Sequence, residues 1–248
     1  MDVFDGIKKQ IEHRSLLAVL VDPDKVSHNS EDALADHIAA SKADLVFVGG
    51  SLIFSDIDGL VERLKARISQ PVILFPGLSS HFTPKVDAVL FLSLLSGRNP
   101  DFLIGNQVHA AIPMLRSGVE VIPTAYILID GGSTTSVEYM SNTKPIPANK
   151  PDITLATAAA AQLLGFKLLY LEAGSGAQHH VPSKTIRTLK QQLSLPMIVG
   201  GGIRTEKALR EVLDAGADIV VVGTAFEEDA SLMDRFCEIV SQHRGKER

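Results

Sequence analysis

The sequence predicts an α/β fold, a (β/α)8 TIM barrel that forms a single domain over residues 1–248. Short runs rich in valine, isoleucine and leucine alternate with longer helical patterns along the whole chain. These runs are apolar almost without interruption, which is typical of parallel strands that are covered on both faces. Eight such runs within 248 residues also match the strand count and the size of this barrel.

The expected strands are spread along the chain, and helical patterns fill most of the gaps between them. Helices are expected where apolar residues recur every three or four positions, at residues 31–42, 102–118, 154–165 and 205–216. Strands are expected at residues 16–22, 44–50, 72–77, 86–93, 120–129, 167–173, 196–202 and 218–224.

The connection between the third and fourth strands differs from the others. Residues 78–85 are too few for a helical crossover, so the third βα unit is expected to be irregular. A doubly wound open sheet is the alternative architecture. It predicts fewer strands and a glycine-rich turn after the first one, where this chain has Asp22, Pro23 and Asp24.

Composition and charge exclude several classes of protein. With 24 basic and 29 acidic residues the net charge is −5, so no basic surface for nucleic acid is expected. No apolar run approaches the ~18 residues that span a bilayer, and the N-terminal stretch is polar, unlike a signal peptide. The single cysteine, Cys237, allows no internal disulfide and is expected to pack in a helix. These features predict a soluble cytoplasmic protein.

Glycines mark the ends of three consecutive strands near the C-terminus. They occur at Gly174 and Gly176, which flank Ser175, at residues 200–202, and at Gly223 before Thr224. Loops without side chains let a ligand approach the backbone, where N–H groups can converge on an anion. Tight turns in a crowded barrel are the alternative explanation for each glycine. Three clusters together favour a barrel of the phosphate-binding type, which binds phosphate after strands seven and eight.

Two polar residues precede the first of these loops. Tyr170 and Glu172 are two positions apart on a strand, so both side chains point to the same side. If that side is the barrel interior, both reach the mouth beside the phosphate loop. Glu172 could then accept a hydrogen bond from a substrate hydroxyl or take its proton. The alternative is a solvated glutamate at a strand end.

The first two strands end in oxygen ligands. Asp22 follows the first strand and Ser51 follows the second. A carboxylate and a hydroxyl are hard ligands, and Mg²⁺ typically takes one or two from the protein and the rest from water and substrate phosphate. A helix cap or a turn would explain Asp22 equally well, so the spacing alone leaves both interpretations open.

Longer motifs give the chain a resemblance to a known family. They are VDPDK at 21–25, GGS at 49–51, NPDFLIGNQ at 99–107, EVIPTAYILI at 120–129, TKPIP at 143–147, YLEAGSGA at 170–177, GGGIRT at 200–205 and VGTAF at 222–226. Together they resemble the geranylgeranylglyceryl phosphate synthase family, which includes the bacterial heptaprenylglyceryl phosphate synthases. The resemblance runs along nearly the whole chain.

The resemblance implies a Mg²⁺-dependent prenyltransferase. It would join geranylgeranyl diphosphate to the sn-3 hydroxyl of sn-glycerol 1-phosphate, giving geranylgeranylglyceryl phosphate and diphosphate for ether phospholipid synthesis. Asp22 and Ser51 would hold Mg²⁺, and Glu172 and Tyr170 would be catalytic. The residues implied to bind glycerol 1-phosphate are Tyr170, Leu171, Glu172, Ala173, Gly174, Ser175, Gly176, Gly201, Gly202, Gly223 and Thr224. Family members assemble, so a homo-oligomer is expected, and the protein would contact a membrane only transiently to release its product.

The chain departs from the family pattern at two places. Many relatives have Lys-Leu-Asp-Pro where this chain has Leu20, Val21, Asp22 and Pro23, and relatives often have Gly-Asn in the eighth loop. Thr224 replaces that asparagine and can still offer an N–H and a hydroxyl, so the expectation of phosphate binding remains.

Two other functions share the phosphate loops. A sugar-phosphate isomerase or epimerase would need a second acid–base residue facing Glu172, for which Asp22 is the one candidate. A non-catalytic phosphate-ligand binding protein would show no Mg²⁺ dependence.

A prenyl chain would need an apolar trough, which is expected along strands two to four beside the irregular third unit. Residues 130–151 are polar and contain glycine, and they are expected either to form a mobile cover or to be a loop without function.

Overall fold

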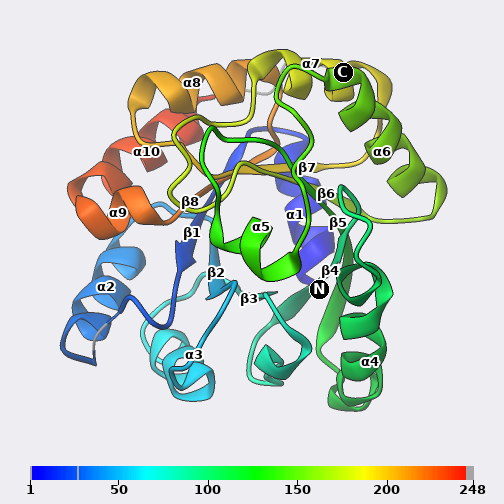
Figure 1. The fold of residues 1–248 in the computed structure, drawn as a ribbon. Helices are drawn as coiled ribbons and strands as arrows, with labels where there is room; N and C mark the ends of the chain where they lie inside the picture. The colour runs from blue at the N-terminus through cyan, green and yellow to red at the C-terminus, as the bar shows by residue number, and fades with distance from the viewer. Residues whose placement is uncertain (1, 27, 244–248) are drawn as a thin grey trace.

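Eight parallel strands close into a barrel in the computed structural model, which describes residues 2–26 and 28–243 (Figure 1). Each strand pairs with the next along the chain, and the eighth pairs with the first, in the register Leu16 with Ile219. The closed order confirms the TIM barrel and excludes the open sheet. The strands are β1 (Leu16–Val21), β2 (Leu45–Gly50), β3 (Val72–Pro76), β4 (Ala88–Leu94), β5 (Glu120–Leu128), β6 (Leu168–Glu172), β7 (Met197–Gly200) and β8 (Ile219–Val222).

Helices surround the barrel and connect its strands (Figure 1). The longer ones are α1 (Val3–Ile11), α2 (His28–Ala40), α3 (Ile57–Lys65), α4 (Asn106–Ser117), α6 (Pro151–Leu163), α7 (Ser183–Gln192), α8 (Glu206–Ala215) and α10 (Ser231–Gln242). Short elements are the 3-10 turn η1 (Ser79–His81), the π-helical turn η2 (Asp101–Gly105), α5 (Ser136–Ser141) and α9 (Thr224–Glu228). No helix among the described residues has both the length and the apolarity needed to cross a bilayer.

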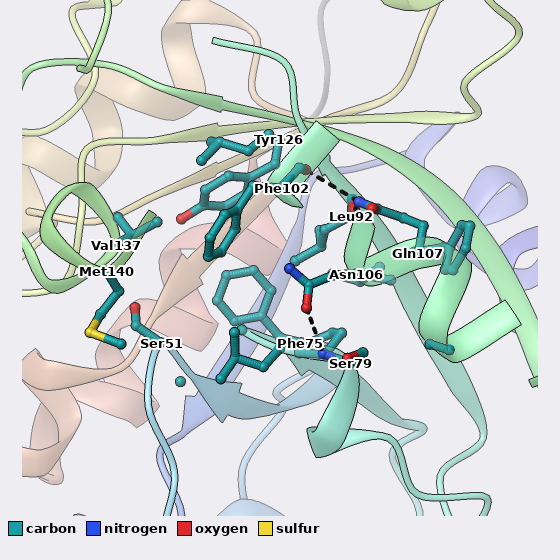
Figure 2. Close-up of a pocket in the computed structure, with 18 of the residues that line it drawn as sticks. Ser51, Phe75, Ser79, Leu92, Phe102, Asn106, Gln107, Tyr126, Val137 and Met140 are labelled. Atoms are coloured by element: carbon teal, nitrogen blue, oxygen red, sulfur yellow. Dashed lines mark hydrogen bonds between the residues drawn. The ribbon is translucent and has the colours of Figure 1, made fainter. Parts of the chain in front are cut away.

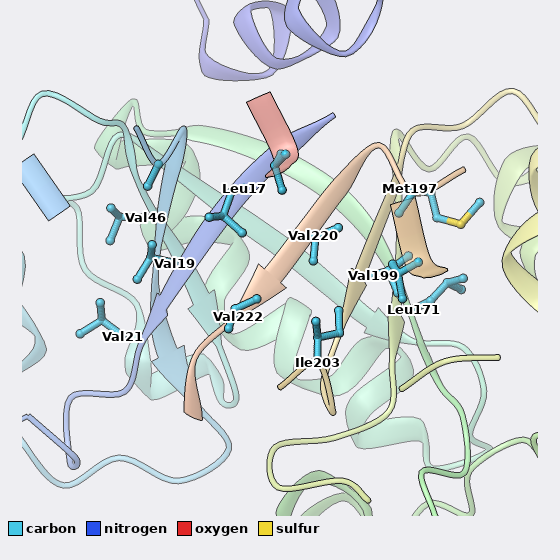
Figure 3. Packing of buried hydrophobic residues seen from close by; sticks show 14 of the residues in the cluster. Leu17, Val19, Val21, Val46, Leu171, Met197, Val199, Ile203, Val220 and Val222 are labelled. Carbon is cyan, nitrogen blue, oxygen red and sulfur yellow. The ribbon is translucent and has the colours of Figure 1, made fainter. Parts of the chain in front are cut away.

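Strand side chains alternate between two buried layers, which explains why the strand sequences are apolar throughout. On β1, Leu17 and Val19, labelled in Figure 3, belong to the outer cluster between strands and helices, whereas Leu16 and Ala18 belong to the cluster inside the barrel. Because both faces of each strand are covered, charged residues in the strands appear only at their ends, as Glu120 and Glu172 do.

Helix α1 closes the end of the barrel opposite α5. Its side chain Phe4 joins the interior cluster, and the N–H group of Phe4 donates to the Glu120 carboxylate at the start of β5 over 3.1 Å. A carboxylate at a helix N-terminus is favourable because it meets unpaired N–H groups and the positive end of the helix dipole. The open end of the barrel is therefore the carboxyl end of the strands.

The third βα unit is irregular, as predicted. Only η1 stands between β3 and β4, where the other crossovers contain an α-helix. Residues 130–151 contain more regular structure than expected. They include α5, and Ile146 pairs in a strand-like bridge with Ile129, just before the segment. Cys237 is buried in α10, and burial raises the pKa of its thiol to about 11, which confirms the expected packing role.

Candidate active site at the carboxyl end of the barrel

Tyr170 and Glu172 point to the same side, as the two-residue spacing predicted, and that side is the barrel interior. Tyr170 is completely buried, and its ring stacks on Phe75 at 5.1 Å between centroids and packs against Tyr126 at 5.3 Å. Glu172 is 5% exposed at the end of β6. The three rings form an apolar floor below this carboxyl group.

The environment of Glu172 suits a proton acceptor. Burial raises the pKa of its carboxyl group to about 7, while the N–H of Gly174, 2.6 Å from Oε1, acts in the opposite direction. A base whose pKa lies near the working pH combines a useful ionised fraction with a strong tendency to take a proton. Glu172 is therefore the best placed general base in the described part of the chain.

The Tyr170 hydroxyl lies beside this carboxyl group. Among the described residues it is buried without a hydrogen-bond partner, and burial followed by the charge of Glu172 holds its pKa well above the usual range. Gly200 flanks both groups: a Cβ added there would lie 3.1 Å from the hydroxyl and 3.4 Å from Glu172 Oε2. Tyr170 thus stays protonated and can donate to the carboxylate or to a bound ligand.

The three glycine loops meet above Glu172. Gly174 and Gly201 have φ values of 102° and 75°, which other residues rarely adopt. The hydroxyl groups of Ser175 and Thr224 are 3.4 Å apart, so the loops after β6 and β8 are in contact. Thr205 is already used as the N-cap of α8, where its hydroxyl accepts from the N–H of Ala208 over 3.2 Å.

Most of the predicted site residues line one cavity. Asp22, Ser51, Tyr170, Glu172, Ser175, Gly176, Gly201, Gly202, Gly223 and Thr224 all border it. Leu171, Ala173 and Gly174 do not border it, and the side chains of Leu171 and Ala173 belong to the cluster drawn in Figure 3, where Leu171 is labelled. The two-residue alternation that turns Tyr170 and Glu172 inward turns the side chains of these two outward, so Leu171 and Ala173 could contact a ligand in the cavity only through their backbone.

Gly201 has no room for a side chain. A Cβ there would lie 2.6 Å from the carbonyl oxygen of Gly174, and the positive φ adds strain. We expect Gly201→Ala to lower the free energy of unfolding by about 1–3 kcal/mol and to weaken the binding of phosphate ligands. Urea denaturation and calorimetry with inorganic phosphate measure both effects. Gly118→Ala is the control, because Gly118 has φ 73° and nothing within 4 Å of the added atom. Equal losses of stability and of phosphate affinity in the two variants would contradict the steric explanation.

Asp22 and Ser51 lie on the opposite side of the cavity. Asp22 is half-buried, and burial raises the pKa of its carboxyl group, whereas the N–H of Asp24, 3.1 Å from Oδ1, lowers it. Gly50 leaves the carboxylate open to the cavity, since a Cβ there would lie 3.4 Å from it. A carboxylate and a hydroxyl in this arrangement fit Mg²⁺, which favours oxygen ligands.

The donor set also limits which cation could bind. Within residues 2–26 and 28–243 no three histidine, cysteine, aspartate or glutamate side chains gather as a metal site. A cation held by Asp22 and Ser51 would complete its shell with water and ligand oxygens. That is the usual behaviour of Mg²⁺ beside phosphates and not that of a structural metal.

Several cavity residues could not be identified from sequence spacing. Lys25 Nζ lies 3.2 Å from Glu227 and 3.8 Å from Asp22, so a cation stands beside the proposed metal ligand. Arg204 is exposed at the cavity rim. Lys25 belongs to the VDPDK motif and Tyr126 to the EVIPTAYILI motif, whereas no motif contains Glu227.

An apolar trough adjoins the cavity (Figure 2). It runs between β3, β4, η1 and α4, where the trough was predicted, and α5 contributes Val137 and Met140. The lining shared with the polar cavity consists of Gly50, Ser51, Phe75, Tyr126 and Val137. A ligand could therefore hold its charged end near Ser51 and its apolar part in the trough. Because α5 lies within residues 130–151, part of that segment covers the trough.

The chain is similar to proteins of one family. The model of the PcrB family matches residues 8–242. A geranylgeranylglyceryl phosphate synthase of Flavobacterium johnsoniae is 48% identical over 222 residues, which cover 89% of this chain and 91% of that protein. One of Chitinophaga pinensis is 46% identical over 224 residues, covering 90% and 89%.

A solved structure extends the similarity to three dimensions. It is (S)-3-O-geranylgeranylglyceryl phosphate synthase of Thermoplasma acidophilum, in complex with its substrate sn-glycerol-1-phosphate. The TM-score is 0.90 at 35% identity, over 98% of this chain and 99% of that one.

Proposed function

This chain belongs to the PcrB family, and from that premise we propose that it is a prenyltransferase acting on glycerol phosphate. The reaction joins geranylgeranyl diphosphate to the sn-3 hydroxyl of sn-glycerol 1-phosphate and releases diphosphate, with geranylgeranylglyceryl phosphate as the product. The observation that carries the proposal is the position of Glu172. This buried carboxyl group lies in a cavity that has phosphate-type glycine loops on one side and continues into an apolar trough on the other.

The glycerol phosphate occupies the loop side of the cavity in this proposal. The phosphate lies against the loops that contain Gly201, Gly202, Gly223 and Thr224, with the hydroxyl of Ser175 beside them. Glycine loops suit an anion because their N–H groups are unobstructed. The glycerol hydroxyl then points toward Glu172, and Tyr170 donates to the ionised carboxylate or to the substrate.

The prenyl diphosphate occupies the other side. Its apolar chain lies in the trough, and its diphosphate lies near Asp22 and Ser51, which would hold Mg²⁺, with Lys25 as an additional cation. Bound Mg²⁺ would neutralise charge that develops on the departing diphosphate.

The bond changes follow from this placement. The allylic C–O bond breaks and its electron pair leaves with the diphosphate, while the glycerol oxygen forms the new ether bond to that carbon. The hydroxyl proton passes to Glu172, whose raised pKa allows it to accept the proton near neutral pH. The rings of Phe75, Tyr126 and Tyr170 keep this region apolar, which strengthens the electrostatic interactions within it.

The trough favours prenyl transfer over the two alternatives. A sugar phosphate is too small and too polar to fill an apolar trough beside the phosphate loops. An isomerase or epimerase activity therefore does not explain the trough. A non-catalytic phosphate binder leaves the raised pKa of Glu172 and the open carboxylate of Asp22 unexplained.

A prenyl-transfer assay tests the proposal. Purified protein is incubated with radiolabelled sn-glycerol 1-phosphate and geranylgeranyl diphosphate, once with Mg²⁺ and once with a chelator. We expect a lipid-extractable product that forms only with Mg²⁺, and diphosphates with other chain lengths then rank the preference. Tight binding of glycerol phosphate without product at any chain length would contradict prenyl transfer.

Assembly and location complete the proposal. We include a homo-oligomer, because η2 exposes Ile104 and α4, which follows it, exposes Val108, Ile112 and Leu115, and an exposed apolar helix surface favours a partner. Light scattering of the purified protein measures its oligomeric state, and a monomer at micromolar concentration would contradict the proposed oligomer.

The cytoplasm is the proposed location, which suits a free, buried Cys237, with transient membrane contact for product release. Cell fractionation tests both statements.

A further inference from the structure

The motif NPDFLIGNQ folds into an unusual element beside the trough. Its residues Asp101–Gly105 form a π-helical turn that leads directly into α4. The backbone N–H of Asn106 donates to the carbonyl oxygen of Asp101, five residues earlier, and the side-chain Nδ2 of Asn106 donates to the same oxygen over 2.9 Å. One residue therefore supports the wide turn twice. Such turns are rare and frequently occur at functional sites.

Asn106 also connects the two walls of the trough. Its Oδ1 accepts a hydrogen bond from the N–H of Ser79 over 3.2 Å, as Figure 2 shows. Ser79 begins η1, the short element that replaces a helix in the third βα unit. Because Ser79 and Asn106 both line the trough, this side chain fixes the separation of η1 from the π-helical turn.

Gln107 supports the same turn from the inside. Its Nε2 donates to the carbonyl oxygen of Leu92 at the end of β4, and it lies 3.3 Å from the carbonyl oxygen of Phe102. Gln107 is 6% exposed, although it borders an apolar trough. Burying an amide in such surroundings is unfavourable unless it is hydrogen-bonded, and the Oε1 of Gln107 is buried without a partner among the described residues, so this costly position calls for a specific role. That role is to hold Phe102, whose ring enters the trough near Tyr126 (Figure 2).

We propose that Asn106 and Gln107 are positioning residues that hold the π-helical turn as one wall of the trough and thereby select the prenyl chain. This inference rests on the proposed function, since it assigns the trough to the prenyl substrate. Neither amide takes part in bond making: Asn106 acts through the backbone of Asp101 and Ser79, and Gln107 acts through that of Phe102. Without them the turn can tighten toward an α-helix, which moves Phe102 relative to Phe75 and changes the width of the trough.

Asn106→Ala and Gln107→Met are the variants that test this role. Each variant loses hydrogen bonds that hold the wall of the trough, and we expect the KM for geranylgeranyl diphosphate to rise by about 10-fold, which corresponds to about 1.4 kcal/mol of binding free energy. We expect kcat to change by less than about 3-fold and the KM for sn-glycerol 1-phosphate to stay constant, because the cavity around Glu172 is untouched. The ranking of prenyl diphosphates of 15, 20 and 35 carbons should become flatter. Calorimetry with an unreactive prenyl thiodiphosphate measures the same loss without turnover.

Two further variants keep the test decisive. Asn106→Asp has the same shape and keeps an acceptor but cannot donate to Asp101, so it should show the same effects if the alanine variant fails to fold. Gln162→Ala is the matched control, since Gln162 also joins two elements through its amide, accepting from the N–H of Ser194 over 2.8 Å, away from the trough. Hydrogen exchange at residues 101–107 should accelerate in the Asn106 variants and not in the control.

The outcomes separate this inference from the proposed function. If wild-type protein makes no prenylated product, the proposed function fails. If wild-type protein is active while the variants keep its KM, its chain-length ranking and its thiodiphosphate affinity, the trough remains a prenyl site but the positioning role is wrong. A fall in kcat alone, with unchanged KM, would also contradict it.

Discussion

Glu172→Gln is expected to lose about 10²- to 10⁴-fold of prenyl-transfer activity while its fold persists, which is the usual contribution of a positioned general base. Glutamine has nearly the same shape, and its oxygen can still accept the N–H of Gly174. It cannot take the proton of the glycerol hydroxyl. The assay measures kcat at saturating substrates, and calorimetry with sn-glycerol 1-phosphate checks that the ligand still binds. Turnover like that of the wild type would remove Glu172 from the mechanism.

The same substitution is expected to stabilise the protein at high pH. The folded state holds the proton on Glu172 up to about pH 7, whereas the carboxyl group has an ordinary value of 4.5 in the unfolded chain. The folded state therefore binds more protons within this window, so the free energy of unfolding falls as pH rises through it. Glutamine does not titrate, and the variant should gain up to about 3 kcal/mol over wild type at pH 8 and much less at pH 5. Equal stability at pH 8 would show that the buried carboxylate is not destabilising.

Asp22→Ala is expected to abolish the response to Mg²⁺ and to reduce activity by about 10²-fold or more, since metal stabilisation of a leaving group is worth several kcal/mol. Asp22 is the one carboxylate of the proposed ligand pair, and Ser51 alone is a weak ligand. Because burial already disfavours the charge of Asp22, its removal should not unfold the protein. Activity is measured across Mg²⁺ concentrations.

A binding measurement without turnover accompanies this prediction. Electron paramagnetic resonance measures free Mn²⁺ in the presence of inorganic diphosphate, with and without protein. The additional Mn²⁺ that the wild-type protein binds should disappear in Asp22→Ala. Asp56→Asn is the control: it removes an acidic charge from the loop after β2, and asparagine can still cap α3 at the N–H of Gly59. Mg²⁺ activation that survives in Asp22→Ala would place the metal elsewhere.

The barrel and the common direction of Tyr170 and Glu172 could be predicted because they depend on short-range sequence patterns. Strand sequences are apolar throughout because both faces are covered, and the spacing of Tyr170 and Glu172 fixed their common direction. The same alternation, applied consistently, would also have excluded the side chains of Leu171 and Ala173. Those two were included because the family motif is continuous in sequence, whereas the cavity contacts only every second side chain.

The remaining features depend on contacts between distant segments. The rings of Phe75 and Tyr126 surround Tyr170 only because β3, β5 and β6 all turn side chains into the same closed barrel. The ion pair of Lys25 with Glu227 joins the loop after β1 to helix α9 near the other end of the chain. The π-helical turn has no periodic signature, because residues 102–118 show the pattern of an ordinary helix. The turn is identified only from the structure, where Asn106 donates two hydrogen bonds to the carbonyl oxygen of Asp101.

The pH dependence of kcat/KM for sn-glycerol 1-phosphate tests most directly that Glu172 is the base. Activity needs the ionised carboxylate, so kcat/KM should rise with pH and level off above a pKa of about 7. Substrate phosphates titrate nearby, and for that reason the same scan is made with Glu172→Gln, whose substrates ionise identically. We expect the inflection that belongs to the enzyme to be present in wild type and absent from the residual activity of the variant. Identical profiles for the two proteins would contradict it.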